Sequence, residues 1–257
     1  MKKRSGQVKE LIVDKLNEIE QKENVKILLA VESGSRAWGF ASPDSDYDVR
    51  FIYVKPAKEY LKLNPARDVI EEPINDMLDI NGWDLQKALK LLYKSNLTLF
   101  EWCSSPIIYK ETEFADNLRS VMKNYFSVKR SLYHYISMAE GNYRGYLKGE
   151  TVRAKKYFYV LRPLLACRWI LDNKTPPPVQ FSELVKEELP LELVKEVDKL
   201  LELKVHFPEV KEIPRMDVIN KYLEQSIAEI KCLIPSIKET KTPSWDKLNE
   251  LFYYLIH

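Results

Sequence analysis

Cysteine, histidine and glycine are scarce in this chain of 257 residues, and each shortage excludes a class of protein. The three cysteines, Cys103, Cys167 and Cys232, show no Cys-x-x-Cys spacing and have apolar neighbours, so we expect buried free thiols in a reducing compartment. The three histidines lack the partners that a zinc site or a Ser-His-Asp triad would need. Even so, 45% hydrophobic residues are typical of a globular protein, not of a disordered one.

Long apolar runs and a strong charge imbalance are also absent. No segment has the apolar length that a signal peptide or a membrane helix requires, so we expect a cytoplasmic protein that does not bind a membrane. Forty basic and 38 acidic residues leave a formal net charge of +2. This balance neither demands nor excludes a nucleic-acid partner.

A turn between two predicted strands organises the chain. The apolar segments Val25 to Val31 and Val49 to Val54 are typical of strands, and small residues follow the first of them. Gly34 and Ser35 allow a tight turn at this strand end. Because consecutive peptide N–H groups there form a concave anion site, we expect phosphate as the occupant, with the cation of Arg36 beside it.

Two aspartates open the second predicted strand. Asp46 and Asp48 are separated by one residue, so an extended chain places both carboxylates on one face. Such a pair suits a hard cation, above all Mg²⁺. Each half of the pattern is also ordinary turn or surface composition when it stands alone. The combination of both halves, in this order at two strand ends, is far more specific.

This combination resembles the signature of the DNA polymerase beta-type nucleotidyltransferase superfamily. Within it, residues 34–39 (GSRAWG) and 45–50 (SDYDVR) are most similar to the predicted nucleotidyltransferases of the YcgL, or RNA-repair-associated polymerase beta (RlaP), family. The likeness extends through residues 78–92, 98–109 and 155–170. It implies catalysis with two Mg²⁺ ions, for which Mn²⁺ is a substitute, and a nucleoside triphosphate such as ATP in the site.

The resemblance also implies a third carboxylate on a neighbouring strand, and the sequence offers two candidates. Asp79 falls in a short apolar pattern around Leu78 and Ile80 that predicts a strand. Asp84 follows a turn signal at Asn81 and Gly82 and has the position of a helix N-cap. We therefore prefer Asp79 as the third metal ligand and keep Asp84 as the alternative.

The fold class predicted is α+β. A small mixed-sheet domain like the polymerase beta palm spans residues 1–95, and an all-helical domain that closes the nucleotide cleft spans residues 96–257. In the second domain, a helix over residues 151–171 places Lys155, Tyr159 and Arg162 on one side. We expect these three to bind the nucleotide, and the alternative is a solvated face of snorkelling cations. Helices over residues 181–203, 215–233 and 245–256 follow a proline-rich linker.

The predicted activity is transfer of a nucleoside monophosphate from an NTP to an acceptor hydroxyl. RNA, a protein side chain and a small molecule all offer such a hydroxyl, and the family's association with RNA repair favours RNA. The alternative is a catalytically silent nucleotide-binding sensor or an antitoxin-like partner. Loss of a carboxylate would favour that alternative, and all three candidate positions are filled.

Overall fold

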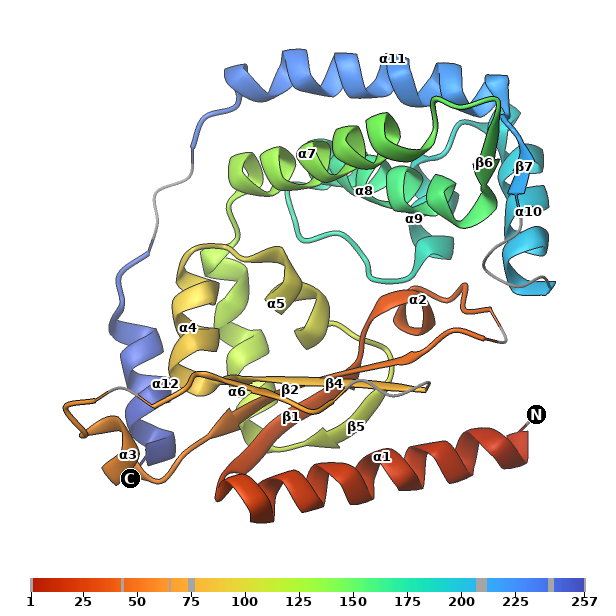
Figure 1. Cartoon of the computed structure of the whole chain (residues 1–257). Coiled ribbons are helices and arrows are strands. Elements are labelled where there is room, and N and C mark those ends of the chain that lie inside the picture. Colours follow the sequence, from red (N-terminus) through yellow and green to blue (C-terminus); the bar gives the residue numbers. More distant parts are fainter. Residues whose placement is uncertain are drawn as a thin grey trace. The chain divides into compact units, whose positions relative to one another are not determined.

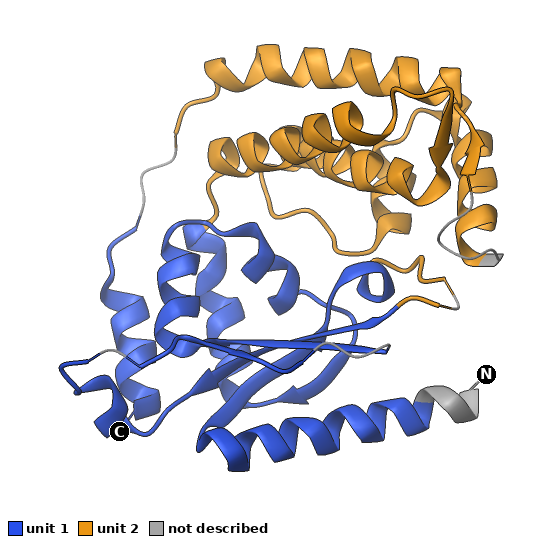
Figure 2. Cartoon of the chain, in the orientation of Figure 1, with its two compact units in different colours: residues 1–37, 46–125, 242–257 blue, residues 38–45, 126–241 orange. Residues whose placement is uncertain are grey.

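The computed structural model describes residues 2–42, 44–64, 66–73, 77–206, 212–239 and 243–256, with side chains from residue 6 onward except at residue 206. The sequence also predicts a third strand over residues 65–73, of which Pro65 lies outside the described residues. The chain divides into two compact units (Figure 2), unit 1 being Met1–Ala37, Asp46–Tyr125 and Thr242–His257, and unit 2 being Trp38–Ser45 and Phe126–Lys241. The predicted domain boundary after residue 95 thus falls inside unit 1.

Unit 1 is built on a five-stranded mixed sheet in the order β3-β4-β2-β1-β5. The strands are β1 (Lys26–Glu32), β2 (Tyr47–Val54), β3 (Val69–Glu71), β4 (Leu78–Asp84) and β5 (Ile108–Glu111). β2 pairs parallel with β4, and the other neighbouring strands pair antiparallel. The fold class predicted from the sequence is therefore confirmed, with a mixed sheet at its centre.

Helices cover both faces of this sheet (Figure 1). They are α1 (Lys2–Glu23), α4 (Leu85–Tyr93), α5 (Leu97–Cys103), α6 (Glu113–Met122) and α12 (Asp246–Ile256), with two single turns, α2 (Gly34–Ala37) and α3 (Ala57–Tyr60). The apolar stripe of α1, formed by Ile12, Leu16 and Ile19, is at most 2% exposed and packs on one face of the sheet. Each such side chain stabilises the fold by about 1.5–3 kcal/mol through burial. On the other face α4 buries Leu85 and Leu89.

The chain returns to unit 1 with its last helix. The rings of Trp245, beside α12, and Tyr93, at the end of α4, stack with centroids 3.6 Å apart. Phe252 of α12 contacts Tyr60 of α3, with centroids 5.1 Å apart. Unit 1 is therefore assembled from three separate stretches of the chain, which interleave with unit 2 in sequence (Figure 2).

The predicted turn at Asn81 and Gly82 is wrong, because β4 continues without a break to Asp84. Both residues are paired on each side, with β2 and with β3. A Cβ atom on Gly82 would lie 2.1 Å from Cε2 of Phe51, so the glycine makes room for a core aromatic ring on the neighbouring strand.

Unit 2 is mainly helical, with a two-stranded ribbon. Its elements are α7 (Val128–Tyr146), β6 (Thr151–Arg153), α8 (Ala154–Asn173), α9 (Phe181–Glu188), α10 (Leu191–His206), β7 (Glu212–Pro214) and α11 (Asp217–Leu233). The single helix predicted over residues 181–203 is wrong: α9 ends before Pro190, since proline lacks the N–H that a continuing helix would use. In the part of the chain described, no helix is both long enough and apolar enough to cross a bilayer.

Residues 38–45, which connect the turn at Gly34 to the strand that carries Asp48, belong to unit 2. Phe40 is 1% exposed and packs between Phe158 of α8, at 4.9 Å between ring centroids, and Phe181 of α9, at 5.4 Å. The N–H of Phe181 also donates to the carbonyl of Trp38 at 2.9 Å. The two ends of the motif are therefore in unit 1, whereas Phe40, which lies between them in sequence, is part of the core of unit 2.

Two of the three predicted buried thiols are confirmed. Cys103 and Cys167 are buried and free. Cys232 is free but exposed, so that prediction is wrong. The buried stripe of α11 includes Ile227 and Ile230, and Cys232 lies off this stripe.

Candidate active site

Two of the predicted carboxylates lie opposite each other on neighbouring strands. Near the start of the parallel pair of β2 and β4, Asp48 is in register with Asp79. Their side chains are 29% and 32% exposed. Asp46 directly precedes β2 and is exposed, and its charge acts on Asp48. The structure therefore brings the three aspartates to the region where the neighbouring strands β2 and β4 begin, in unit 1.

An arginine that the sequence analysis missed lies between these carboxylates. Nη2 of Arg50 donates to Oδ1 of Asp48 at 2.9 Å and to Oδ2 of Asp79 at 2.7 Å. Its position two residues after Asp48 in β2 is the signal that was available, because alternate residues of a strand share a face. The same alternation that pairs Asp46 with Asp48 also places Arg50 beside them.

The glycine of the predicted phosphate turn lies directly against Asp48. Gly34 has φ +60° and would place a Cβ atom 2.0 Å from Oδ2 of Asp48. The preceding N–H, that of Ser33, donates to the carbonyl of Asp48 at 2.8 Å. Ser35 follows in α2 and is half-buried. The turn and the Asp-x-Asp strand are therefore in contact, as the motif predicts.

Arg36 is held beside Asp46. Its Nε donates to the Asp46 carbonyl at 3.0 Å, and its guanidinium carbon lies 3.6 Å from the centroid of the Tyr47 ring. A cation over an aromatic face is stabilised by the ring's electron density. Its location next to the aspartates fits the role that the sequence analysis gave it.

A buried glutamate supports the strand that carries Asp48. Oε1 of Glu32 accepts the Asp48 N–H at 2.8 Å, and Oε2 accepts the hydroxyl of Tyr109 from β5. Burial raises the pKa of Glu32, and these two hydrogen bonds oppose the rise. Burial also raises the pKa of Asp48, with Arg50 acting against it and Asp79 and Asp46 adding to it. The sequence analysis missed Glu32 and Tyr109, because only the pairing of β1 with β2 and β5 brings them to Asp48.

The donor chemistry of this site fits a divalent cation. Within the described residues, no three Asp, Glu, His or Cys side chains converge as a formed metal site. Instead, one guanidinium nitrogen lies within hydrogen-bond distance of both Asp48 and Asp79. That nitrogen is a cation supplied by the chain itself, and carboxylate oxygens are the ligands that Mg²⁺ takes in proteins.

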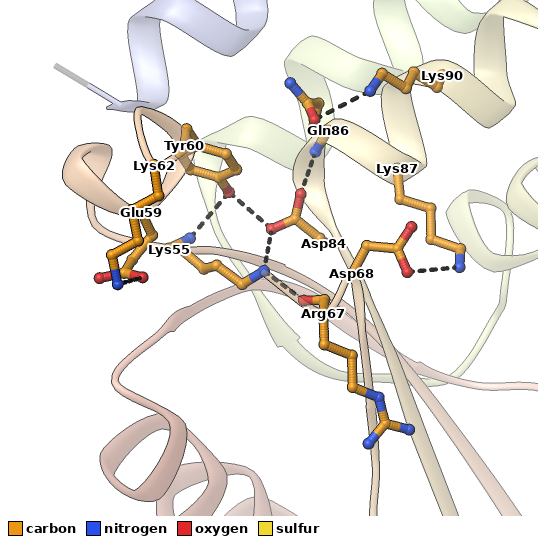
Figure 3. Close-up of polar contacts among 10 residues, drawn as sticks. All are labelled: Lys55, Glu59, Tyr60, Lys62, Arg67, Asp68, Asp84, Gln86, Lys87 and Lys90. Atoms are coloured by element: carbon orange, nitrogen blue, oxygen red, sulfur yellow. Dashed lines mark hydrogen bonds and ion pairs between the residues drawn. The ribbon is translucent and has the colours of Figure 1, made fainter. Parts of the chain in front are cut away.

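Asp84, the alternative third carboxylate, lies at the opposite end of β4 and caps α4 (Figure 3). Its Oδ1 accepts the N–H of Gln86 at 2.8 Å, and its Oδ2 accepts the hydroxyl of Tyr60 at 2.9 Å. Nζ of Lys55 lies 3.5 Å from the same oxygen. Both oxygens of a side chain that is only 4% exposed are thus engaged. The predicted N-cap is confirmed.

The sequence predicts three nucleotide-binding residues on the helix over residues 151–171. These residues, Lys155, Tyr159 and Arg162, belong to α8 in unit 2. Lys155 and Tyr159 are half-buried, and Arg162 is 4% exposed. The guanidinium carbon of Arg162 lies 4.4 Å from the Trp38 ring centroid, and Nη2 donates to the Val179 carbonyl at 3.4 Å. A solvated face therefore does not describe Arg162. Binding of a nucleotide by these residues stays a prediction.

A family model and a relative from Bacillus subtilis each match almost the whole chain. The model of the "RNA repair pathway DNA polymerase beta family" matches residues 8–254. "Uncharacterized protein YcgL" of Bacillus subtilis (strain 168) is 48% identical over 252 residues, which cover 97% of this chain and 96% of YcgL.

A solved structure is also similar, though weakly. It is that of a nucleotidyltransferase-like protein from Exiguobacterium sibiricum 255-15, with 12% sequence identity and a TM-score of 0.32. The match covers 95% of this chain and 79% of that one. The family match and the relative at 48% identity each cover almost the whole chain, Gly-Ser turn and Asp-x-Asp strand included, so this chain belongs to the RNA repair pathway DNA polymerase beta family.

Proposed function

We propose that this protein is a nucleotidyltransferase that moves a nucleoside monophosphate from an NTP to an acceptor hydroxyl. The observation that carries the proposal is the register pairing of Asp48 with Asp79, in contact with the Gly34 turn. Family membership supports the same reaction class. A transfer of this kind needs positioning and charge neutralisation more than it needs a protein nucleophile.

Each part of the site has a role in this proposal. The triphosphate binds at Gly34 and Ser35, with the cation of Arg36 against its anionic oxygens. Arg36 is already oriented by the Asp46 carbonyl and the Tyr47 ring. On α8 in unit 2, Lys155, Tyr159 and Arg162 are further proposed nucleotide contacts, of which half-buried Lys155 is the accessible cation.

Asp46, Asp48 and Asp79 would hold Mg²⁺, two ions in the full proposal, with Mn²⁺ as a substitute. When bound, such ions neutralise phosphate charge and lower the pKa of an acceptor hydroxyl. The acceptor oxygen bonds to the α-phosphorus as the bond from that phosphorus to the bridging oxygen of the β-phosphate breaks. Pyrophosphate leaves with the electron pair, and the hydroxyl proton passes to a site carboxylate or to water.

RNA is the acceptor that we favour, because the family is described by an RNA repair pathway. A protein hydroxyl and a small molecule are the other outcomes of the test. A silent nucleotide-binding sensor is the second candidate function. The observation in its favour is that Arg50 already forms an ion pair with both Asp48 and Asp79 within the protein.

The test is to incubate the full chain with each α-labelled NTP, Mg²⁺ and a pool of RNA, protein or small-molecule acceptors. Label in RNA supports the proposal in full, and label in another acceptor corrects the acceptor alone. Asp48→Asn should abolish transfer and leave the melting temperature nearly unchanged, since Asp48 lies among like charges. Asp68→Asn, which alters an exposed aspartate paired with Lys87, is the matched control. Undiminished transfer by the Asp48→Asn protein would overturn the assignment.

A further inference from the structure

Arg50 is held more firmly than a surface ion pair requires. In addition to the two carboxylates, its Nη1 donates to the Asp79 carbonyl at 2.7 Å and to the Val49 carbonyl at 3.1 Å. Its side chain is 18% exposed. A planar guanidinium is suited to several acceptors in fixed directions, whereas a lysine ammonium is not. Four acceptors from two strands therefore fix this cation between Asp48 and Asp79.

The site needs a cation at this position whether or not a metal ion is present. Asp48 and Asp79 face each other across the parallel pair of strands and are mostly shielded from water. Two like charges so placed repel each other until a cation arrives. Arg50 supplies one positive charge against the three negative charges of Asp46, Asp48 and Asp79.

Arg50 contacts the same two carboxylates, Asp48 and Asp79, that would hold a metal ion. Oδ2 of Asp48 faces the backbone of Gly34, where a Cβ atom would be 2.0 Å away. The remaining oxygen, Oδ1, shares Nη2 of Arg50 with Oδ2 of Asp79. An ion that joins the two carboxylates therefore meets the guanidinium in its place.

We propose that Arg50 is the resident counter-cation of this site, and that it competes with a divalent metal ion for the carboxylates of Asp48 and Asp79. The inference rests on the proposed function for the metal itself. The family match assigns Arg50 no role. In this proposal, binding of the metal ion exchanges the guanidinium of Arg50 for the ion. Arg50 thereby lowers the affinity of the protein for free metal.

The test measures binding of Mn²⁺ alone to the full chain without nucleotide, by loss of the electron paramagnetic resonance signal of free Mn²⁺. Arg50→Gln removes the charge and should tighten Mn²⁺ binding by about tenfold or more, the worth of at least one charge-assisted hydrogen bond. Arg67→Gln is the control, because it removes an exposed arginine whose partner is Glu71. This control should bind Mn²⁺ as the parent does.

A second variant tests the proposal if Arg50→Gln folds poorly, which its melting curve would reveal. Arg50→Lys keeps the charge without the planar fork, so its Mn²⁺ affinity should rise by less. Free guanidinium ion at low millimolar concentration should weaken Mn²⁺ binding by the Arg50→Gln protein and leave the parent unaffected.

Equal or weaker Mn²⁺ binding by folded Arg50→Gln and Arg50→Lys proteins would overturn the proposal and make Arg50 a residue that orients the two aspartates for the metal. Absence of Mn²⁺ binding in parent and variants would overturn it as well. The labelled-NTP assay is independent of these results. If loss of Arg50 raises the affinity for Mn²⁺ but the parent protein transfers no nucleotide, the inference about Arg50 stands and the proposed function is wrong.

Discussion

At the scale of single residues, the tightest constraint is the approach of Gly34 to Asp48. Gly34→Ala would place a methyl group 2.0 Å from Oδ2 of Asp48 at a backbone φ of +60°. The carboxylate must then move, and a displacement of about 1 Å at a reacting site costs roughly a hundredfold in rate. We therefore expect nucleotidyl transfer to fall by about that factor.

Gly39→Ala separates this contact from backbone strain. Gly39 has φ +88°, but an added Cβ atom there would have no neighbour within 4 Å. Both variants carry the cost of a left-handed alanine, about 1–2 kcal/mol, in thermal unfolding. Only Gly34→Ala should lose transfer. Equal activity of the two variants would show that the contact with Asp48 is unimportant.

Asp79 tests the assignment of the third carboxylate. Because Asp79 is 32% exposed and bonded to Arg50, Asp79→Asn keeps the shape of the side chain and removes one charge. We expect loss of transfer with only a small change in unfolding free energy, since asparagine keeps an oxygen acceptor for Arg50 and removes the repulsion between Asp79 and Asp48. Activity and chemical denaturation of the same preparation measure both. Retained transfer would remove Asp79 from the catalytic set.

At the scale of elements, Asp84 connects α4 to the loop around α3. Asp84→Ala removes the side chain that caps α4 by accepting the Gln86 N–H. It also removes the carboxylate oxygen shared by the hydroxyl of Tyr60 and the ammonium of Lys55 (Figure 3). A cap is worth about 1 kcal/mol, and a buried polar group left unpaired costs about 1–3 kcal/mol more. We expect about 2–4 kcal/mol of destabilisation in denaturant unfolding, with transfer retained.

Asn96→Ala is the comparison for Asp84. Asn96 caps α5 through one bond, its side-chain oxygen accepting the Leu99 N–H at 3.2 Å. Its loss should cost only about 1 kcal/mol. If the two variants are destabilised equally, the contacts of Asp84 with Tyr60 and Lys55 add nothing to the cap.

The contact between α8 and α9 makes unit 2 sensitive to pH. Burial, together with the charge and the hydrogen bond of Asp172, raises the pKa of Glu188 to about 7 against the opposing charge of Arg168. Glu187 and Tyr222 are the other titratable neighbours. Because the folded state holds this proton more tightly than the unfolded state, stability falls as pH rises from about 4.5 to about 7.

Asp172→Asn should reduce this pH dependence. Loss of the neighbouring charge lowers the pKa of Glu188, so melting temperatures measured at pH 5 and pH 8 should differ less than in the parent. Glu196→Gln, which alters an exposed pair with Lys199 on α10, is the control and should keep the parent's difference. An unchanged difference in the Asp172→Asn protein would show that Asp172 does not contribute to the raised pKa of Glu188.

At the scale of the whole molecule, unit 1 is made from discontinuous segments. A fragment of residues 1–95 would lack α5, α6, α12 and β5, which pairs with β1. The exposed edge of β1 and the uncovered face of the sheet then favour aggregation over folding. We expect no cooperative thermal transition for this fragment by circular dichroism. A cooperative transition would show that residues 1–95 fold as a domain on their own, as the sequence-based division implies.

Much of the site follows from the sequence because its signals are local. The tight turn needs a glycine, alternation along an extended chain predicts Asp46 and Asp48 on one face, and Asp84 has the position of an N-cap. These properties depend on neighbours within a few residues, so periodicity and turn chemistry are enough to predict them. β1, β2 and the start of α4 after Asp84 were predicted correctly for the same reason.

Only the tertiary structure decided which of these residues meet. The local sequence at Gly82 predicts a turn, but Gly82 lies in β4. A glycine is needed there because the ring of Phe51 on the neighbouring strand fills the space of a side chain. Arg50 reads as one cation among forty basic residues, and only the parallel pairing of β2 with β4 places it between Asp48 and Asp79. Strand order and helix packing depend on contacts between residues far apart in the chain. A local pattern therefore determined the chemical groups of this site, and the long-range pairing of strands determined the counter-cation that they face.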